Sequence, residues 1–306
     1  MLLAIGGDPH ALPPFTAAAV ITQSRVDPVL AVGLVLAGGL YLWGVRRLRL
    51  RGDSWSPGRT WAWLAGGLGT IAVATMSGLG AYDDTLFSVH MVQHMLLAMV
   101  APVFLALGAP VTLALRVLPG GSRRALLGAL HSRAVKVLTF PLVGWLLFVF
   151  NPFVLYFSPL YEASLRHAWV HEWMHLHFLL VGCLFFWPLV GLDPIPGRVA
   201  YPLRALLLFV ALPFHAILGL SIMGSGQLIA GDYYEGLHLS WSDPHSEQRV
   251  GGGLLWASGD LVGLLMLGSV VVQWTRASER EAEREDRRLD RLEALARQTE
   301  QPDDSG

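Results

Sequence analysis

Charged residues are scarce in this chain. Asp, Glu, Lys and Arg make up 15% of its 306 residues, whereas about a quarter is usual for soluble domains, whose surface must face water. This deficit excludes an ordinary soluble enzyme. The formal net charge of -1 offers no basic surface for a phosphate backbone, so we expect no nucleic-acid partner. The single cysteine, Cys183, excludes a disulfide framework and a paired-cysteine metal site.

Long apolar runs stand where charge is missing, because 53% of the residues are hydrophobic. A helix needs about 20 apolar residues to cross a hydrocarbon core of about 30 Å. None of the runs shows the alternation of a strand, so we predict an all-α polytopic membrane bundle with seven transmembrane helices. The predicted spans are residues 28–45, 61–80, 86–108, 137–157, 167–191, 205–223 and 252–274.

Basic residues lie mainly on one side of these spans. Short loops rich in Lys and Arg stay in the cytoplasm, so the asymmetry predicts an extracytoplasmic N-terminus and a cytoplasmic C-terminus. The expected organisation is an extracytoplasmic segment at 1–27, a transmembrane domain at 28–275 and a charged cytoplasmic tail at 276–306. No basic stretch precedes an apolar core in the first segment, so we expect no cleaved signal peptide. The basic residues of the first and third connections are Arg46, Arg47, Arg49, Arg51, Arg59, Arg116, Arg123, Arg124, Arg133 and Lys136.

Histidine is frequent, with 11 residues, and several fall within predicted spans. An ionisable group inside a membrane helix is costly and is a functional candidate. The third span carries His90 and His94, and the fifth carries His167, His171 and His175. Residues four apart share one face of a helix. This HxxxH spacing lets one helix present two imidazoles to one metal ion.

Four polar groups from four spans are predicted to lie at a similar depth. At a rise of 1.5 Å per residue, His94, His175, His215 and Asp260 each lie about 12 Å from the outer end of their span. We therefore expect a metal site between helices in the outer leaflet. The neighbouring residue His177 points away from His175 by about 200° around the helix and is a poorer candidate.

The types of ligand atom in these spans limit which metal ion can bind. Imidazole nitrogens suit copper, zinc, iron or nickel. The thioethers of Met91, Met95 and Met99 form a neighbouring stripe, and sulfur favours Cu(I) over zinc. Glu172 and Asp260 could ligate the metal or orient an imidazole.

Each element also has a purely structural interpretation. A single histidine such as His215 can hydrogen-bond across helices, and methionines often fill gaps in a core. Asp260 could pair with Ser258. The combined pattern favours a metal or cofactor site over coincidence.

The third span resembles the CtaG family of cytochrome c oxidase assembly factors, the multi-spanning type associated with caa-type oxidases. The segment that carries the resemblance is His-Met-Val-Gln-His-Met-Leu-Leu-Ala-Met-Val-Ala-Pro at 90–102. Further agreement lies in Asn-Pro at 151–152, in His-Glu-Trp-Met-His at 171–175 and in Phe-Trp-Pro-Leu at 186–189. The resemblance covers roughly residues 30–275.

The resemblance implies a bacterial plasma-membrane protein that is needed for active heme-copper oxidase through copper delivery. Oxidase subunits or other copper chaperones would be its partners, besides the bilayer itself. The metal ligands expected on this basis are His90, His94, His171, His175 and His215; His167, Glu172, Asp260, Met91 and Met95 are expected as extra ligands or supporting groups. In the last outer loop, Glu247-Gln248 stands where the family pattern has Asp-Gln.

A non-enzymatic assembly factor is the preferred hypothesis, because no Ser-His-Asp order, phosphate loop or paired catalytic carboxylates are present. The alternative is a membrane redox protein in which two histidines bind heme or the cluster binds iron. A copper or proton transporter is a third interpretation, and the few polar groups of the inner leaflet argue against it. Zinc and iron remain open as alternatives to copper.

Overall fold

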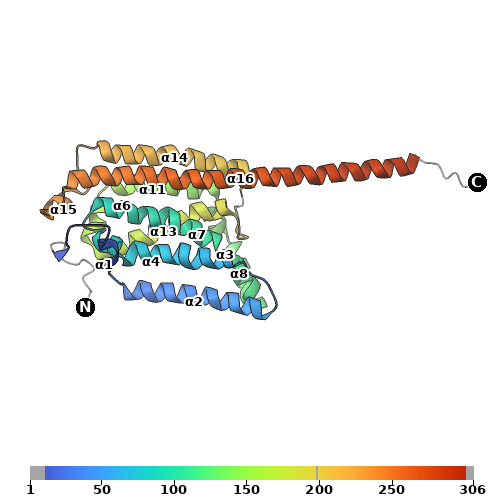
Figure 1. Cartoon of the computed structure of the whole chain (residues 1–306), viewed down its shortest axis with the longest axis horizontal. Coiled ribbons are helices and arrows are strands. Elements are labelled where there is room, and N and C mark those ends of the chain that lie inside the picture. Colours follow the sequence, from blue (N-terminus) through green and yellow to red (C-terminus); the bar gives the residue numbers. More distant parts are fainter. Residues whose placement is uncertain (1–10, 198, 301–306) are drawn as a thin grey trace, which may run out of the picture.

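The computed structural model describes residues 11–197 and 199–300, with side chains as far as residue 294. Within these residues it contains helices and connecting turns and no strand, which confirms the all-α expectation. The helices lie side by side in an elongated bundle, and the C-terminal half of α16 projects far beyond it (Figure 1).

Six helices in the described part of the chain are long and apolar enough to cross a membrane, and a bent pair raises the number to seven. The first span is α2 (Pro28–Leu50), which follows a short α1 (Ala19–Thr22). The second span combines α3 (Pro57–Trp61), the π-helix η2 (Ala62–Leu68), α4 (Gly69–Met76) and α5 (Gly78–Tyr82). The third combines α6 (Phe87–Met95), the π-helix η3 (Leu96–Val100), α7 (Ala101–Leu107) and α8 (Pro110–Val117).

The remaining spans follow two short connecting helices, α9 (Gly120–Leu130) and α10 (Arg133–Leu138). They are the bent pair α11 (Pro141–Tyr156) and α12 (Leu160–Arg166), then α13 (Ala168–Val190), α14 (Tyr201–Gly224) and α16 (Pro244–Glu300), with a short α15 (Gly231–Gly236) before the last.

The fourth span differs from its expected limits of 137–157. Phe140 is extended and Pro141 occupies the first turn, so α11 begins at Pro141 and has 16 residues. At 1.5 Å per residue it is about 24 Å long, which is short for a hydrocarbon core of about 30 Å. The chain then bends by 70° into α12. The seventh span therefore exists only if α11 and α12 together count as one.

Helix starts follow from local chemistry. The Asp27 side chain accepts hydrogen bonds from the backbone N–H groups of Val29 and Leu30, at 2.7 and 2.9 Å, and Pro28 stands in the first turn of α2. Both features stabilise a helix N-terminus. Ala109 has a φ of 48° and turns the chain between α7 and α8.

Glycines allow close helix contacts at two places that position the site. A Cβ on Gly219 of α14 would lie 2.6 Å from the carbonyl oxygen of Gly252 on α16. A Cβ on Gly182 of α13 would overlap the Ala98 carbonyl of η3 and the ring of Pro102. Any larger residue would push these backbones apart, so the third span, α13, α14 and α16 are held at fixed spacing.

The last span is longer than the expected 252–274. A single helix of 57 residues, α16, includes both the span and the charged tail. Every described side chain from residue 278 onward is exposed. The tail is thus a solvated continuation of the last membrane helix.

Candidate metal centre

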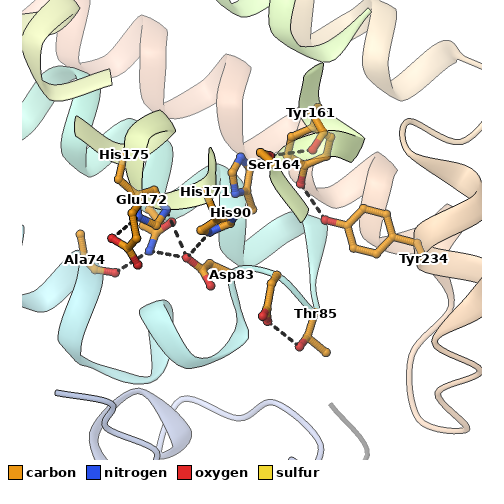
Figure 2. A network of polar contacts seen from close by, with 12 residues as sticks. Ala74, Asp83, Thr85, His90, Tyr161, Ser164, His171, Glu172, His175 and Tyr234 are labelled. Carbon is orange, nitrogen blue, oxygen red and sulfur yellow. Dashed lines mark hydrogen bonds and ion pairs between the residues drawn. The ribbon is translucent and has the colours of Figure 1, made fainter. Parts of the chain in front are cut away.

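The carboxylate of Asp83 lies at the centre of a buried polar group. Asp83 is in the short connection between the second and third spans, directly after α5. Its Oδ2 atom accepts hydrogen bonds from Nε2 of His171 at 2.9 Å and from Nε2 of Gln93 at 2.8 Å. Nε2 of His175 lies 3.2 Å from the same oxygen. Figure 2 shows Asp83 below the two histidines of α13.

Asp83, His171 and His175 can offer ligand atoms to one metal ion. Their three candidate ligand atoms lie within 4.8 Å of one another, and all three side chains are buried. Among the described His, Cys, Asp and Glu residues, these are the ones that meet this condition. The group is called the Asp83 group below.

Asp83 is ionised in this setting. Burial by itself would raise the pKa of the Asp83 carboxyl, but the adjacent rings of His171 and His175 outweigh burial and hold this pKa well below its usual value. Burial and the charge of Asp83 raise the pKa of the neighbouring Asp84 to about 6. The Asp83 group therefore contains one permanent anion near neutral pH.

Unpartnered ring nitrogens show that the Asp83 group fits a metal. Nδ1 of His171 and both ring nitrogens of His175 are buried and lack a hydrogen-bond partner. The 3.2 Å contact of His175 with Asp83 is thus an ion-pair distance without hydrogen-bond alignment. Buried polar atoms without partners cost about 1–3 kcal/mol each. A metal ion would satisfy such nitrogens.

His90 lies beside the Asp83 group. Its ring centroid is 6.1 Å from that of His171 and 4.9 Å from that of Tyr161. Nε2 of His90 contacts the Tyr156 hydroxyl at 3.2 Å, and its Nδ1 is buried without a partner. The Tyr161 hydroxyl is itself 2.6 Å from that of Tyr234. His90 can therefore support a metal bound at His171.

His94 and His215 meet at a different point. They line a cavity of about 10 Å³ together with Met95 and Met99. Nδ1 of His94 is 2.7 Å from the Tyr156 hydroxyl, and its ring stacks on Phe178 with centroids 3.9 Å apart. The five histidines expected around one ion are thus divided between two adjoining groups. We call this second set the His94 cavity.

His215 is packed between α11 and α16. Its ring centroid lies 5.3 Å from that of Phe148. A Cβ on Gly259 would stand 2.8 Å from the His215 ring, so only glycine leaves room for it there. The next residue of α16, Asp260, accepts a hydrogen bond from the Trp256 indole at 2.8 Å. Asp260 is therefore not paired with Ser258, whose hydroxyl instead bonds the Leu254 carbonyl.

Other expected residues lie further from these groups. His167 is exposed, and its Nδ1 is 3.1 Å from the Ala163 carbonyl at the end of α12. Oε2 of Glu172 is 3.9 Å from Nδ1 of His175, within reach of the Asp83 group. The Met91 side chain faces α16. Its Cγ atom lies 3.2 Å from the position that a Cβ on Gly251 would occupy.

His177, the poorer candidate on α13, has a partner outside the Asp83 group. Its Nε2 lies 2.9 Å from Oδ1 of Asn151 on α11. This hydrogen bond accounts for the polar side chains of His177 and Asn151 without a metal ion.

The acid of the last outer loop has a structural partner. Oε2 of Glu247 accepts hydrogen bonds from the backbone N–H of Ser88, at 3.3 Å, and from its hydroxyl. Gln248 is buried, accepts from the Ile229 N–H at 2.7 Å and donates to two carbonyls. Glu247 therefore ties α16 to the start of α6, and Gln248 holds the loop before α16.

Asp83 and Gln93 belong to the candidate site although the expected ligand set did not include them. Asp83 lies in a connection and not inside an expected span. The usable signal was the acid pair Asp83-Asp84 just ahead of the His90 and His94 motif. Gln93 lies within that motif, and its amide also donates to the Ala74 carbonyl at 3.0 Å.

Comparison with known proteins gives the chain a family. Residues 39–277 match the model of the Caa3_CtaG family, described as cytochrome c oxidase caa3 assembly factor. The uncharacterized proteins Mb0105 of Mycobacterium bovis and MT0111 of Mycobacterium tuberculosis are each 43% identical over 286 residues, 90% of this chain and 43% of theirs. The uncharacterized protein ML1998 of Mycobacterium leprae is 38% identical over 277 residues, 88% of this chain and 42% of its own.

The chain thus spans less than half the length of these relatives. No solved structure matches it. Because the family model covers most of the chain, including every histidine of the two groups, the chain belongs to the family of cytochrome c oxidase caa3 assembly factors.

Proposed function

We propose that this protein is a membrane-bound assembly factor for cytochrome c oxidase that binds copper and helps to metallate the oxidase. The observation that carries the proposal is the Asp83 group, in which a buried carboxylate and two buried imidazoles converge with unpartnered nitrogens. Copper is here the cargo. Asp83, His171 and His175 would hold it, with His90 and Glu172 close enough to assist.

The donor set favours copper among the divalent metals. Nitrogen and oxygen sites bind Cu²⁺ more tightly than the other first-row divalent ions, zinc and iron included. Hard ions such as calcium select oxygen ligands and would not use two imidazoles. One carboxylate and two imidazoles leave coordination positions open, as a carrier that must release its ion requires.

The position of the site supports an extracytoplasmic function. In Figure 1 the start of α6 and the short helices α1 and α15 lie at one end of the bundle, and α8 and the start of the second span lie at the other. The basic first and third connections adjoin that second end. By the positive-inside rule, the N-terminus and the Asp83 group then face outward and α16 ends in the cytoplasm of a bacterial cell.

A hollow lies at this outer end, next to the connection that carries Asp83. It has a volume of about 300 Å³ and is lined by Thr85, Phe87, Tyr234 and Glu247, among others. Thr85 follows the acid pair directly, and the Phe87 ring is 6.2 Å from that of Tyr234. An oxidase subunit or a soluble copper chaperone docked at this end would meet the hollow first.

The proposed function is delivery of copper and not catalysis, because the groups at the site are metal donors and their hydrogen-bond partners. The runner-up is a membrane redox protein, in which two histidines from different spans would bind heme. The absorption spectrum of the purified protein separates the two, because bound heme gives an intense Soret band.

The deciding experiment measures metal in the protein purified from its native membrane in mild detergent. We expect copper in the wild type and at least a tenfold loss of copper affinity in His171→Ala/His175→Ala, because two of three ligands are gone. His131→Ala is the control, since His131 is exposed at the end of α9 and belongs to neither the Asp83 group nor the lining of the His94 cavity. Heme at stoichiometric amount, or copper unchanged in the double variant, would contradict the proposal.

A cellular measurement tests the assembly function separately. Deletion of the protein should lower cytochrome c oxidase activity, and added copper should restore part of it. Oxidase activity that is unaffected by deletion would remove the assembly function even if the purified protein bound copper.

A further inference from the structure

We propose that the His94 cavity is a second metal position, built for a soft monovalent ion of the Cu(I) class. This rests on the proposed function, because it gives the same protein a second place for its cargo. His94, His215, Met95 and Met99 all line the cavity, and the donors we propose are their imidazoles and thioethers.

The cavity has room for a single ion. Its volume is about 10 Å³, close to the minimum that holds one water molecule. The rest of its lining is mainly apolar, with the buried side chains of Phe148, Phe178 and Val181, and includes one further polar residue, Asn151. Such a small space admits one small ligand and excludes a cofactor such as heme.

Each imidazole can direct one nitrogen to a ligand. Nδ1 of His94 is engaged by the Tyr156 hydroxyl at 2.7 Å, which leaves Nε2 for a metal. Nδ1 of His215 lies 3.4 Å from the carbonyl of Ala211 on the preceding turn, which again leaves Nε2. A hydrogen bond at one ring nitrogen fixes the orientation of the ring and the tautomer, as is usual for metal-binding histidines.

The donor chemistry differs from that of the Asp83 group. The His94 cavity is lined by no carboxylate and by two thioethers. Thioether sulfur is a soft ligand that selects Cu(I) over zinc and over divalent ions in general. A monovalent ion also needs less neutralising charge, so a site without an acid can hold it in a buried place.

The backbone around the methionines is irregular and held in place. Met99 lies within the π-helix η3, and Met95 is the residue before it. Single turns of π-helix inside α-helices occur often at functional sites. Close packing of Gly182 on the Ala98 carbonyl fixes η3 against α13. The methionines are therefore part of a rigid wall and not of a loosely filled core.

Tyr156 connects the two positions. Its hydroxyl contacts Nδ1 of His94 at 2.7 Å and Nε2 of His90 at 3.2 Å. His90 in turn lies beside His171 of the Asp83 group. The Tyr156 hydroxyl thus joins the hydrogen-bond networks of the two positions.

The test is an anaerobic titration of the full chain in detergent with Cu(I), against a chromophoric Cu(I) chelator. We expect Met95→Leu/Met99→Leu to bind one Cu(I) fewer per chain than the wild type. Leucine has nearly the volume of methionine, so the fold tolerates the change while the sulfur is lost. X-ray absorption at the copper edge should show sulfur ligands in the wild type and none in this variant.

Met91→Leu is the matched control. Met91 is buried on the same helix but packs at Gly251 and not in the cavity. It should keep the Cu(I) stoichiometry of the wild type and the sulfur signal. Circular dichroism and gel filtration establish that each variant is folded, and the absence of copper–sulfur scattering in the wild type itself would overturn the second position without any variant.

The outcomes separate this inference from the proposed function. Full stoichiometry with sulfur scattering in Met95→Leu/Met99→Leu would overturn the second position. The proposed function would survive that result if His171→Ala/His175→Ala still lost copper affinity. A wild type that binds no copper at all would overturn both.

Discussion

Nε2 of His171 lies 2.9 Å from the Asp83 carboxylate, across 88 residues of sequence. The contact joins the connection after α5 to the first turn of α13. It also places an anion beside an imidazole whose other nitrogen is buried without a partner. The same pair of residues therefore stabilises the fold and forms part of the proposed copper site.

Replacement of Asp83 by asparagine should separate charge from shape. Asp83→Asn keeps the size of the side chain but removes the anion, so we expect copper affinity to fall by about 10- to 100-fold. Loss of the charged partner of His171 should also lower the free energy of unfolding by about 1–3 kcal/mol. Copper titration and thermal unfolding in detergent measure the two effects.

Asp53→Asn is a suitable control for Asp83→Asn. Asp53 pairs with Arg116 at 3.3 Å, but both side chains are largely exposed. An exposed pair contributes about 0–1 kcal/mol. Equal copper affinity in Asp83→Asn and the wild type would remove Asp83 from the set of ligands.

Copper binding should weaken as the pH falls. Imidazole must lose its proton to bind a metal, and its usual pKa is near 6.5. The pKa of Asp83 is held well below its usual value by His171 and His175, so this carboxylate stays ionised from pH 8 to pH 5. Proton release on copper binding should therefore come from histidine. Calorimetric titration in buffers of different ionisation enthalpy counts these protons, and a copper affinity that does not change between pH 8 and pH 5 would contradict imidazole ligation.

Hydropathy and spacing predict much of this arrangement. The i,i+4 spacing predicts that His171 and His175 share one face of α13, and their ring centroids lie 4.5 Å apart. Counting residues from span ends predicts the depth of His94, His175 and His215, but it carries no information on how each helix is rotated about its axis. This is why one expected site is two adjoining groups.

Two other features lie beyond sequence patterns for a similar reason. Asp83 reaches α13 because helices that are distant in sequence pack together. The hydropathy of each span taken singly carries no information on this packing. The 70° bend between α11 and α12 falls where the expected span 137–157 ends, and hydropathy gives no sign of it. Hydropathy measures transfer into lipid and not the direction of the chain.

Removal of the Tyr156 hydroxyl should affect both histidine positions. Tyr156→Phe deletes the contacts with His90 and His94 and keeps the ring, whose centroid is 6.0 Å from that of Phe87. We expect a loss of about 1–3 kcal/mol in stability and a drop of about tenfold in Cu(I) affinity, because the His94 ring loses its orienting partner. Tyr233→Phe serves as control, since Tyr233 is only half-buried and contacts neither histidine. Identical Cu(I) titrations for the two variants would show that Tyr156 does not orient His94.

Gln248 should be important for stability and not for copper. Gln248→Leu leaves the Ile229 N–H and the carbonyls of Ile222 and Gln227 without this partner. Unsatisfied buried groups cost about 1–3 kcal/mol each, so the midpoint of thermal unfolding should fall by several degrees. Arg249→Ala, at an exposed neighbour, should leave the midpoint unchanged. A Gln248→Leu protein as stable as the wild type would mean that the loop before α16 is held by other contacts.

The charged end of α16 should be dispensable for the bundle. Its described side chains from residue 278 to 294 are all exposed, and its ion pairs, such as Glu283 with Arg287 at 3.7 Å, are local to the helix. Exposed pairs of this kind contribute a few tenths of a kcal/mol to the helix alone. A stop codon at residue 278 should therefore leave both the unfolding midpoint and the copper content of the detergent-purified protein unchanged. If oxidase activity in cells nevertheless falls with this truncation, the helix contacts a partner in the cytoplasm. A fall in copper content would instead show that the tail supports the site itself, which no described contact predicts.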